Sequence, residues 1–212
     1  MTCRAFLDTP VADDTLAELL TKASRAPSGG NVQPWKIYVI NGEAMDEFQA
    51  FLSSREIEPP GYDIYPPGLW EPHRTARYEL GEQMYELLGI GRDDKPARIR
   101  RMMDNYRFFG APAAFFCFLD RRMGPPQWSD CGMFLQTLML LAVEAGLATC
   151  PQEIWAHRSR AVAEFVKAPD ELMLFCGMAV GYADHDHPVN ALRSERLPLD
   201  SFAEWVGDRQ PS

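Results

Sequence analysis

This sequence of 212 residues has no long hydrophobic run. Its longest apolar tract, residues 133–143, contains Gln136 and Thr137 and is shorter than the roughly 20 residues that cross a bilayer. The opening residues, MTCRAFLDTP, also lack the apolar stretch of a secretory signal. We therefore expect a cytoplasmic protein that has no membrane partner.

Positive charge is scarce as well. There are 21 Lys and Arg residues against 30 Asp and Glu residues, which gives a net charge of −9. Nucleic-acid binding in general needs a basic face for the phosphates, so this composition argues against a nucleic-acid partner. A few local arginines could still hold a small anionic ligand.

Three further motifs are absent or incomplete. The five cysteines form no C-x-x-C pair, and their odd number favours free thiols in a reducing compartment over a disulfide framework. No G-x-G-x-x-G follows a predicted strand, so a Rossmann nucleotide site is unsupported. The tripeptide His185-Asp186-His187 lacks a third and a fourth ligand nearby, and we predict no metal site.

The hydrophobic periodicity that is present predicts both helices and strands. Helices are expected at residues 14–24, 43–54, 73–90, 94–104, 130–147 and 199–207, and strands at 35–40, 113–119 and 171–182. Residues 57–72 are rich in Pro, Gly and aromatic residues and predict an irregular flap. Because strands and helices do not alternate strictly, we predict an α+β fold, with a central, mostly antiparallel sheet flanked by helices, in one domain over 1–212.

The loop APSGGNVQPW (residues 26–35) follows the first helix. Gly29 and Gly30 would let the main chain approach a ligand closely, and Ser28, Asn31 and Gln33 add polar side chains. Such a set suits the polar edge of a heteroaromatic ring. A plain connection between a helix and a strand would use the same residues, so composition leaves both readings open.

Basic and polar residues also gather near the two ends of the chain. Thr2 and Arg4 lie in MTCRAF, and Arg193, Ser194 and Arg196 lie in NALRSERLP. Each group alone is typical of a solvated surface, whereas together they could bind one phosphate. In ATCPQEIWAH (148–157), we expect Pro151 to end the regular element and to leave backbone N–H groups free at Gln152 and Glu153.

At this point the chain resembles the FMN-dependent nitroreductase family. The resemblance rests on RAPSGGNVQPW, on TCPQE after a long apolar helix and on GYADHDHPVNALRSERLPLDSF, and PPGLWEP and NYRFFGAP add to it. It covers nearly the whole chain.

The resemblance implies a role for each matching residue. Thr2, Arg4 and Arg196 match positions that hold the FMN phosphate, with Arg193 as an additional contact. Pro27, Ser28, Gly29 and Asn31 match the loop along the isoalloxazine ring. The backbone of Gln152 and Glu153 matches the segment that faces flavin N5 and O4, and Arg107 matches a cation that some relatives place near N1 and O2.

The implied activity is that of an FMN oxidoreductase. NADH or NADPH would be the electron donor, and a small-molecule acceptor such as a nitroaromatic or a quinone would be reduced in the same pocket. No side chain is expected to act as the catalytic group, because the flavin carries the chemistry. Four aromatic residues are expected near the acceptor: Tyr62, Tyr65, Trp70 and Trp128. Alternatives are a specialised reaction such as reductive dehalogenation and a flavin-binding module without turnover.

The predicted helix 130–147 is apolar nearly all round its axis. One face can pack on the sheet, and the opposite face would then expose a large apolar patch unless a partner covers it. We therefore predict a homodimer, as the resemblance also implies, and we expect Leu138 and Leu141 on the face between the subunits.

Overall fold

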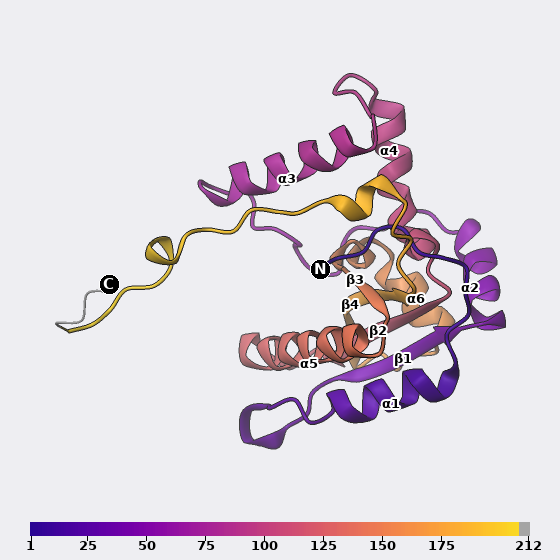
Figure 1. Cartoon of the computed structure of the whole chain (residues 1–212). Helices are drawn as coiled ribbons and strands as arrows, with labels where there is room; N and C mark the ends of the chain where they lie inside the picture. The colour runs from indigo at the N-terminus through magenta and orange to yellow at the C-terminus, as the bar shows by residue number, and fades with distance from the viewer. Residues whose placement is uncertain (208–212) are drawn as a thin grey trace.

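A four-stranded antiparallel sheet with the order β1-β2-β4-β3 forms the centre of the protein (Figure 1). The computed structural model describes residues 1–207. The strands are β1 (Lys36–Asn41), β2 (Ala113–Asp120), β3 (Ala148–Gln152) and β4 (Leu172–Gly181). Among the described residues there are six α-helices: α1 (Asp13–Ala23), α2 (Glu43–Ser53), α3 (His73–Leu87), α4 (Lys95–Met103), α5 (Pro125–Glu144) and α6 (Ser159–Phe165). The predicted α+β fold with an antiparallel sheet is confirmed.

Strand β2 is buried on both faces, which explains why its sequence is a continuous apolar run. Phe115 and Cys117 face one hydrophobic cluster, to which α1 and α5 contribute. Phe116 and Phe118 face a second cluster, which contains residues of α2, α6 and the 3₁₀ segment Asp104–Gly110. Helices therefore cover both faces of the sheet.

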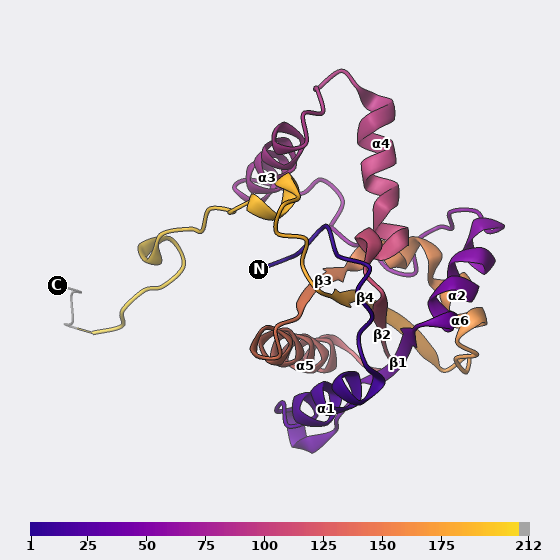
Figure 2. The ribbon, with the colours of Figure 1, turned by 45° about the vertical axis from the view of Figure 1, so that its right-hand side comes forward.

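Helices α3 and α4 stand apart from these two layers. Neither contains a buried residue, and Figures 1 and 2 show them projecting beyond the sheet. The segment that follows the 3₁₀ turn Pro188–Ala191 also leaves the body of the molecule, as both views show. Over residues 1–207, we find no helix with enough length and apolar character to cross a membrane.

Several predicted boundaries need correction. Helix α5 begins at Pro125, because proline is well tolerated in the first turn, where its missing N–H is not needed. Pro151 does not end a regular element, since it lies within β3, an edge strand that pairs only with β4 inside the sheet. Only a 3₁₀ turn, Leu199–Ser201, forms in the expected helix 199–207, and α6 was not predicted.

The side chain of Asn190 joins the N-terminal segment to the chain beyond β4. Its amide oxygen accepts a hydrogen bond from Arg4 N at 2.8 Å. Its Nδ2 donates to Ala5 O at 2.8 Å and to Asp184 O at 2.7 Å. Asn190 is only 6% exposed, so water cannot readily replace these partners.

We expect Asn190→Ala to lower the free energy of unfolding by about 3 kcal/mol, because it leaves several buried backbone groups without a partner. Asn190→Asp should also destabilise the protein, since a carboxylate keeps the acceptor but loses both donors to the carbonyls. Urea unfolding measures both changes. An Asn190→Asp variant as stable as the original protein would contradict this assignment of donors.

Candidate functional site

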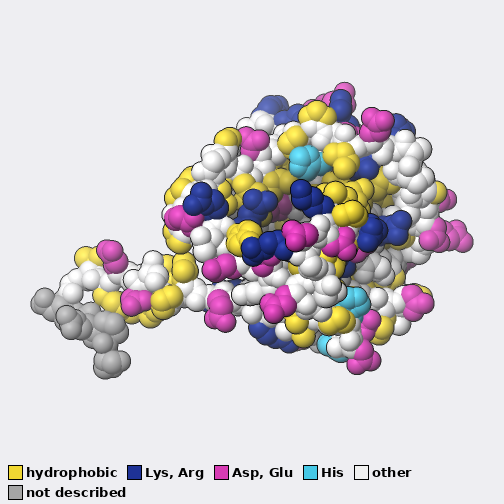
Figure 3. Space-filling model, turned by 90° about the horizontal axis from the view of Figure 1, so that it is seen from above, with side chains coloured by type: hydrophobic (Ala, Val, Ile, Leu, Met, Phe, Trp, Pro, Cys, Tyr) yellow, Lys and Arg dark blue, Asp and Glu magenta, His cyan; other side chains and the backbone are white. Residues whose placement is uncertain are grey.

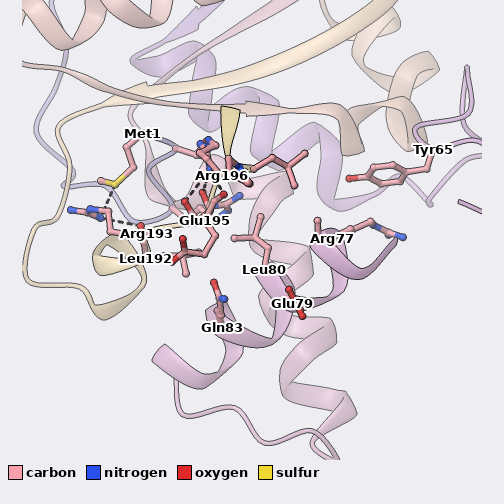
Figure 4. Close-up of a pocket in the computed structure, with 16 residues that line it drawn as sticks. Met1, Tyr65, Arg77, Glu79, Leu80, Gln83, Leu192, Arg193, Glu195 and Arg196 are labelled. Atoms are coloured by element: carbon pink, nitrogen blue, oxygen red, sulfur yellow. Dashed lines mark hydrogen bonds between the residues drawn. The ribbon is translucent and has the colours of Figure 1, made fainter. Parts of the chain in front are cut away.

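A cavity of about 780 Å³ lies between the N-terminal segment, α3 and the chain that follows residue 191. Its lining comes from three distant parts of the sequence. The polar and charged residues among them are Thr2, Arg4, Tyr65, Arg77, Glu79, Gln83, Arg193, Ser194, Glu195 and Arg196. Figure 4 shows Arg193 and Arg196 on one side of the cavity and Arg77 beside Tyr65 on the other.

The arginines of this cavity are not neutralised by ion pairs in the part of the chain that the structure describes. Within residues 1–207, neither Arg4 nor Arg77 nor the pair Arg193 and Arg196 forms a salt bridge. Arg196 Nη1 donates to Ser194 Oγ at 2.6 Å and to nearby carbonyls. Two carboxylates, Glu79 and Glu195, also line the cavity, so positive charge exceeds negative charge there.

This local excess contrasts with the acidic composition of the whole chain, whose net charge is −9. Figure 3 shows Lys and Arg side chains gathered across the middle of the face that α3 and α4 form, with apolar side chains between them. Guanidinium groups that lack carboxylate partners are suited to a phosphate, which accepts several charge-assisted hydrogen bonds. The donor set therefore fits a ligand with a terminal phosphate.

The N-terminal side of the cavity is held in place by backbone and side-chain contacts. Cys3 N donates to Thr149 O at 2.9 Å, so the segment that contains Thr2 and Arg4 lies beside the start of β3. Arg101 Nη2 donates to Arg4 O at 2.8 Å, and Asn190 accepts from Arg4 N. Sequence reasoning predicted Thr2, Arg4, Arg193 and Arg196 but missed Arg77, Asn190 and Arg101, because each looks like an ordinary polar residue until the chain is folded.

Gln152 and Glu153 lie at the far end of β3 from the cavity's N-terminal side. The Gln152 side chain is buried, and its Nε2 donates to Asn105 O at 2.7 Å. Loss of hydration raises the pKa of the Glu153 carboxyl above its ordinary value. Since each residue of a strand adds about 3.3 Å, the backbone at Gln152 lies roughly 10 Å along β3 from Thr149.

The loop of Pro27, Ser28, Gly29 and Asn31 lies elsewhere. It connects α1 to β1, at the end of the molecule where α1 and α5 lie side by side (Figure 1), and none of its residues lines the cavity. Gly30, Asn31 and Gln33 have φ values of 58°, 59° and 50°, so the loop turns back sharply. Within one chain, this loop therefore does not lie next to the arginines of the cavity.

The structure also does not bring Arg107 to the cavity. Arg107 belongs to the 3₁₀ segment Asp104–Gly110, whose Tyr106 and Phe108 side chains point into the core. Its own side chain consequently faces outward, where it lines two other hollows beside α2. Arg107 therefore does not line the arginine cavity, and its match to a cation near flavin N1 and O2 stays a prediction.

The flap residues are divided between packing and the cavity. The Tyr62 hydroxyl donates to Phe175 O, and the Tyr62 ring lies 5.5 Å from the Trp128 ring, so this part of residues 57–72 is pinned to the sheet. Tyr65 lines the cavity, with its ring 4.2 Å from the Arg77 guanidinium carbon. Trp70 is exposed and packs edge-on against His73.

The cysteines belong to the two hydrophobic clusters of the fold. All five are free and buried, and burial raises the pKa of the Cys150 thiol to about 12. In the described part of the chain, no three His, Cys, Asp or Glu side chains are grouped closely enough to hold a metal ion. His187 Nδ1 instead accepts a hydrogen bond from Val189 N at 3.3 Å.

Comparison with known proteins is consistent with this geometry. The sequence model of the Nitroreductase family matches residues 1–182. The chain is 35% identical to a nitrobenzene nitroreductase of Ectopseudomonas oleovorans, over 96% of this chain and 92% of that protein. It is 36% identical to a 4-nitrobenzoate reductase of Pseudomonas putida, over 96% and 91% of the two chains.

A solved structure agrees across nearly the whole fold. It is an FMN- and NADPH-dependent nitroreductase, NfnB, from Sphigopyxis sp. strain HMH, with a TM-score of 0.94 and 46% sequence identity. The alignment covers 98% of this chain and 96% of that chain. The chain belongs to the nitroreductase family.

Proposed function

We propose that this protein is an FMN-dependent oxidoreductase that uses NADH or NADPH to reduce nitroaromatic compounds and similar acceptors. The observation that carries the proposal is a cavity lined by four arginines, none of which has an ion-pair partner among residues 1–207. FMN ends in a phosphate and needs such a site, and the family relatives named above are nitroreductases.

Residues near opposite ends of β3 would bind the two parts of FMN, the phosphate and the flavin ring. Thr2, Arg4 and Arg196 would hold the phosphate, with Arg193 and Arg77 adding positive charge. The backbone at Gln152 and Glu153 would lie along the flavin ring. FMN, when bound, supplies the transfer of reducing equivalents from nicotinamide to acceptor. The side chains therefore need to orient the ligands and do not need to form an acid–base pair.

We further propose that the working unit is a homodimer in which each flavin site uses residues of both subunits. The predicted ring-binding loop lies away from the arginine cavity within one chain, so a second copy would have to supply it. A two-fold partner can do this for both sites at once.

Apolar surface supports a second copy as the partner. Leu140 and Val143 of α5 are 63% and 59% exposed. The C-terminal segment adds exposed apolar side chains at Leu197, Leu199, Phe202, Trp205 and Val206 while it runs away from the body (Figure 1). The expected subunit face is corrected in one respect, since Leu138 is fully buried in the protein's own core and Leu141 packs against it.

All five cysteines are free and buried, which is compatible with a reducing compartment, and we propose the cytoplasm. A disulfide framework is not needed to hold this fold.

Turnover separates the proposed enzyme from its alternatives. We expect purified, FMN-loaded protein to oxidise NADH or NADPH in the presence of 4-nitrobenzoate or menadione faster than an equal concentration of free FMN. Absorbance at the nicotinamide wavelength follows the reaction. Tight FMN binding without such turnover would instead indicate a flavin-binding module, and turnover only with a halogenated aromatic would favour the dehalogenation alternative.

Arg196→Ala should weaken FMN binding by about ten- to a hundredfold, because a charge-assisted phosphate contact contributes about 1.5–3 kcal/mol. Flavin fluorescence during titration of the apoprotein measures the affinity. Arg122→Ala removes the same charge from an exposed side chain that pairs with Asp120 outside the cavity, and it should leave the affinity unchanged. Equal affinity of the Arg196→Ala variant and the original protein would remove Arg196 from the site.

Leu140→Glu should split the dimer and release FMN together, because it places a charge on the exposed apolar side of α5 while the core stays intact. Sedimentation monitored at a flavin wavelength reports both events. Ile57→Glu adds the same charge at another exposed apolar residue, outside α5, and serves as the control. A flavin-loaded monomer of the original protein at micromolar concentration would refute the shared site.

A further inference from the structure

Asp130 is the one buried carboxylate among the described residues, at 5% exposed. It lies in the second turn of α5, and both of its carboxylate oxygens accept from the same donor, Gly29 N, at 3.3 Å. Throughout residues 1–207 it has no cationic partner within 4.0 Å. Removing a carboxylate from water is costly, so a buried position with a single N–H donor calls for an explanation.

The Gly29 N–H belongs to a loop that is otherwise bonded only to itself. Asn31 N donates to Ser28 O at 3.0 Å, and Gln33 N donates to Ser28 Oγ at 3.0 Å. These bonds close the turn but do not connect it to the rest of the protein. Within the described chain, the bond to Asp130 is the only hydrogen bond that ties residues 28–33 to another element.

The shape of this loop is not one that the backbone adopts by default. The left-handed conformation is unfavourable for most residues other than glycine and asparagine, and Gln33 adopts it close to Gly30 and Asn31, which adopt it too. Such a conformation persists when the surroundings hold it. Asp130 is a suitable anchor because α5 is a long helix, and the next residue, Cys131, and Phe134 one turn further on are both buried in the core.

We propose that Asp130 is a positioning residue, which fixes Gly29 to α5 and so holds residues 28–31 in the shape that receives the flavin ring. This inference rests on the proposed role of that loop. The backbone N–H of Gly30 makes no hydrogen bond within residues 1–207. It therefore remains available to a ligand while Asp130 binds the neighbouring Gly29 N–H.

The test compares Asp130→Ala with Asp130→Asn. Alanine removes the acceptor, whereas the asparagine side-chain oxygen can still accept from Gly29 N. In the apoprotein, we expect amide hydrogen exchange at Gly29 to rise about tenfold in Asp130→Ala and to stay within about threefold of the original protein in Asp130→Asn. FMN affinity should fall about tenfold in Asp130→Ala and recover in Asp130→Asn.

Two controls isolate the positioning role. Asp46→Ala removes a carboxylate from the exposed side of α2 and should change neither measurement. The melting temperature of each variant shows whether the fold survives, and Asp130→Ser provides a second deletion of the contact should Asp130→Ala fail to fold.

Each result decides a separate claim. Unchanged Gly29 exchange in a folded deletion variant would overturn the anchor. Faster exchange with unchanged FMN affinity would overturn the role of the loop in flavin binding. If the original protein itself bound no FMN, the proposed function would fail, whereas the exchange data would still decide whether Asp130 holds the loop.

Discussion

The hydrogen bonds of the Asn190 side chain join two of the chain segments that line the arginine cavity or lead to it. Arg4 and Arg196 are separated by almost the whole sequence, and neither segment belongs to a strand of the central sheet. Asn190 accepts from Arg4 N and donates to Ala5 O and to Asp184 O just after β4. Because one buried amide satisfies all three groups, the arginines from the two ends reach one cavity without needing contact with each other.

Much of the fold could be predicted from the sequence because hydrophobic periodicity reflects burial directly. Phe115 to Phe118 form a continuous apolar run because β2 has helices on both of its faces. The stripe of Leu16 and Leu19 predicts α1 for the same reason, since both side chains belong to the hydrophobic cluster that α1 and α5 form with one face of the sheet. The arginines near the two ends of the chain could be singled out because their sequence segments match family motifs, although composition alone is equally typical of a solvated surface.

The remaining features depend on contacts between distant segments. The outward direction of Arg107 follows from the turn of residues 104–110, in which Phe108 and Phe109 have φ values of 51° and 56°. The local sequence does not specify that turn. Likewise, the all-round apolar character of α5 indicates two buried faces, but it cannot tell which leucine meets the core and which remains exposed. The apolar residues of 199–207 lack a packing surface within the chain, and periodicity alone did not produce a helix there.

Pro151 has a consequence for the behaviour of the sheet edge. β3 is a terminal strand, and within residues 1–207 its outer side pairs with the N-terminal segment alone, through Thr2 and Thr149. An unpaired strand edge can recruit strands from other molecules and so start aggregation. Proline has no N–H to offer to an incoming strand, and it interrupts the row of donors two residues beyond that contact. The residue that was expected to end the element therefore reduces the number of donors that this edge offers to an added strand.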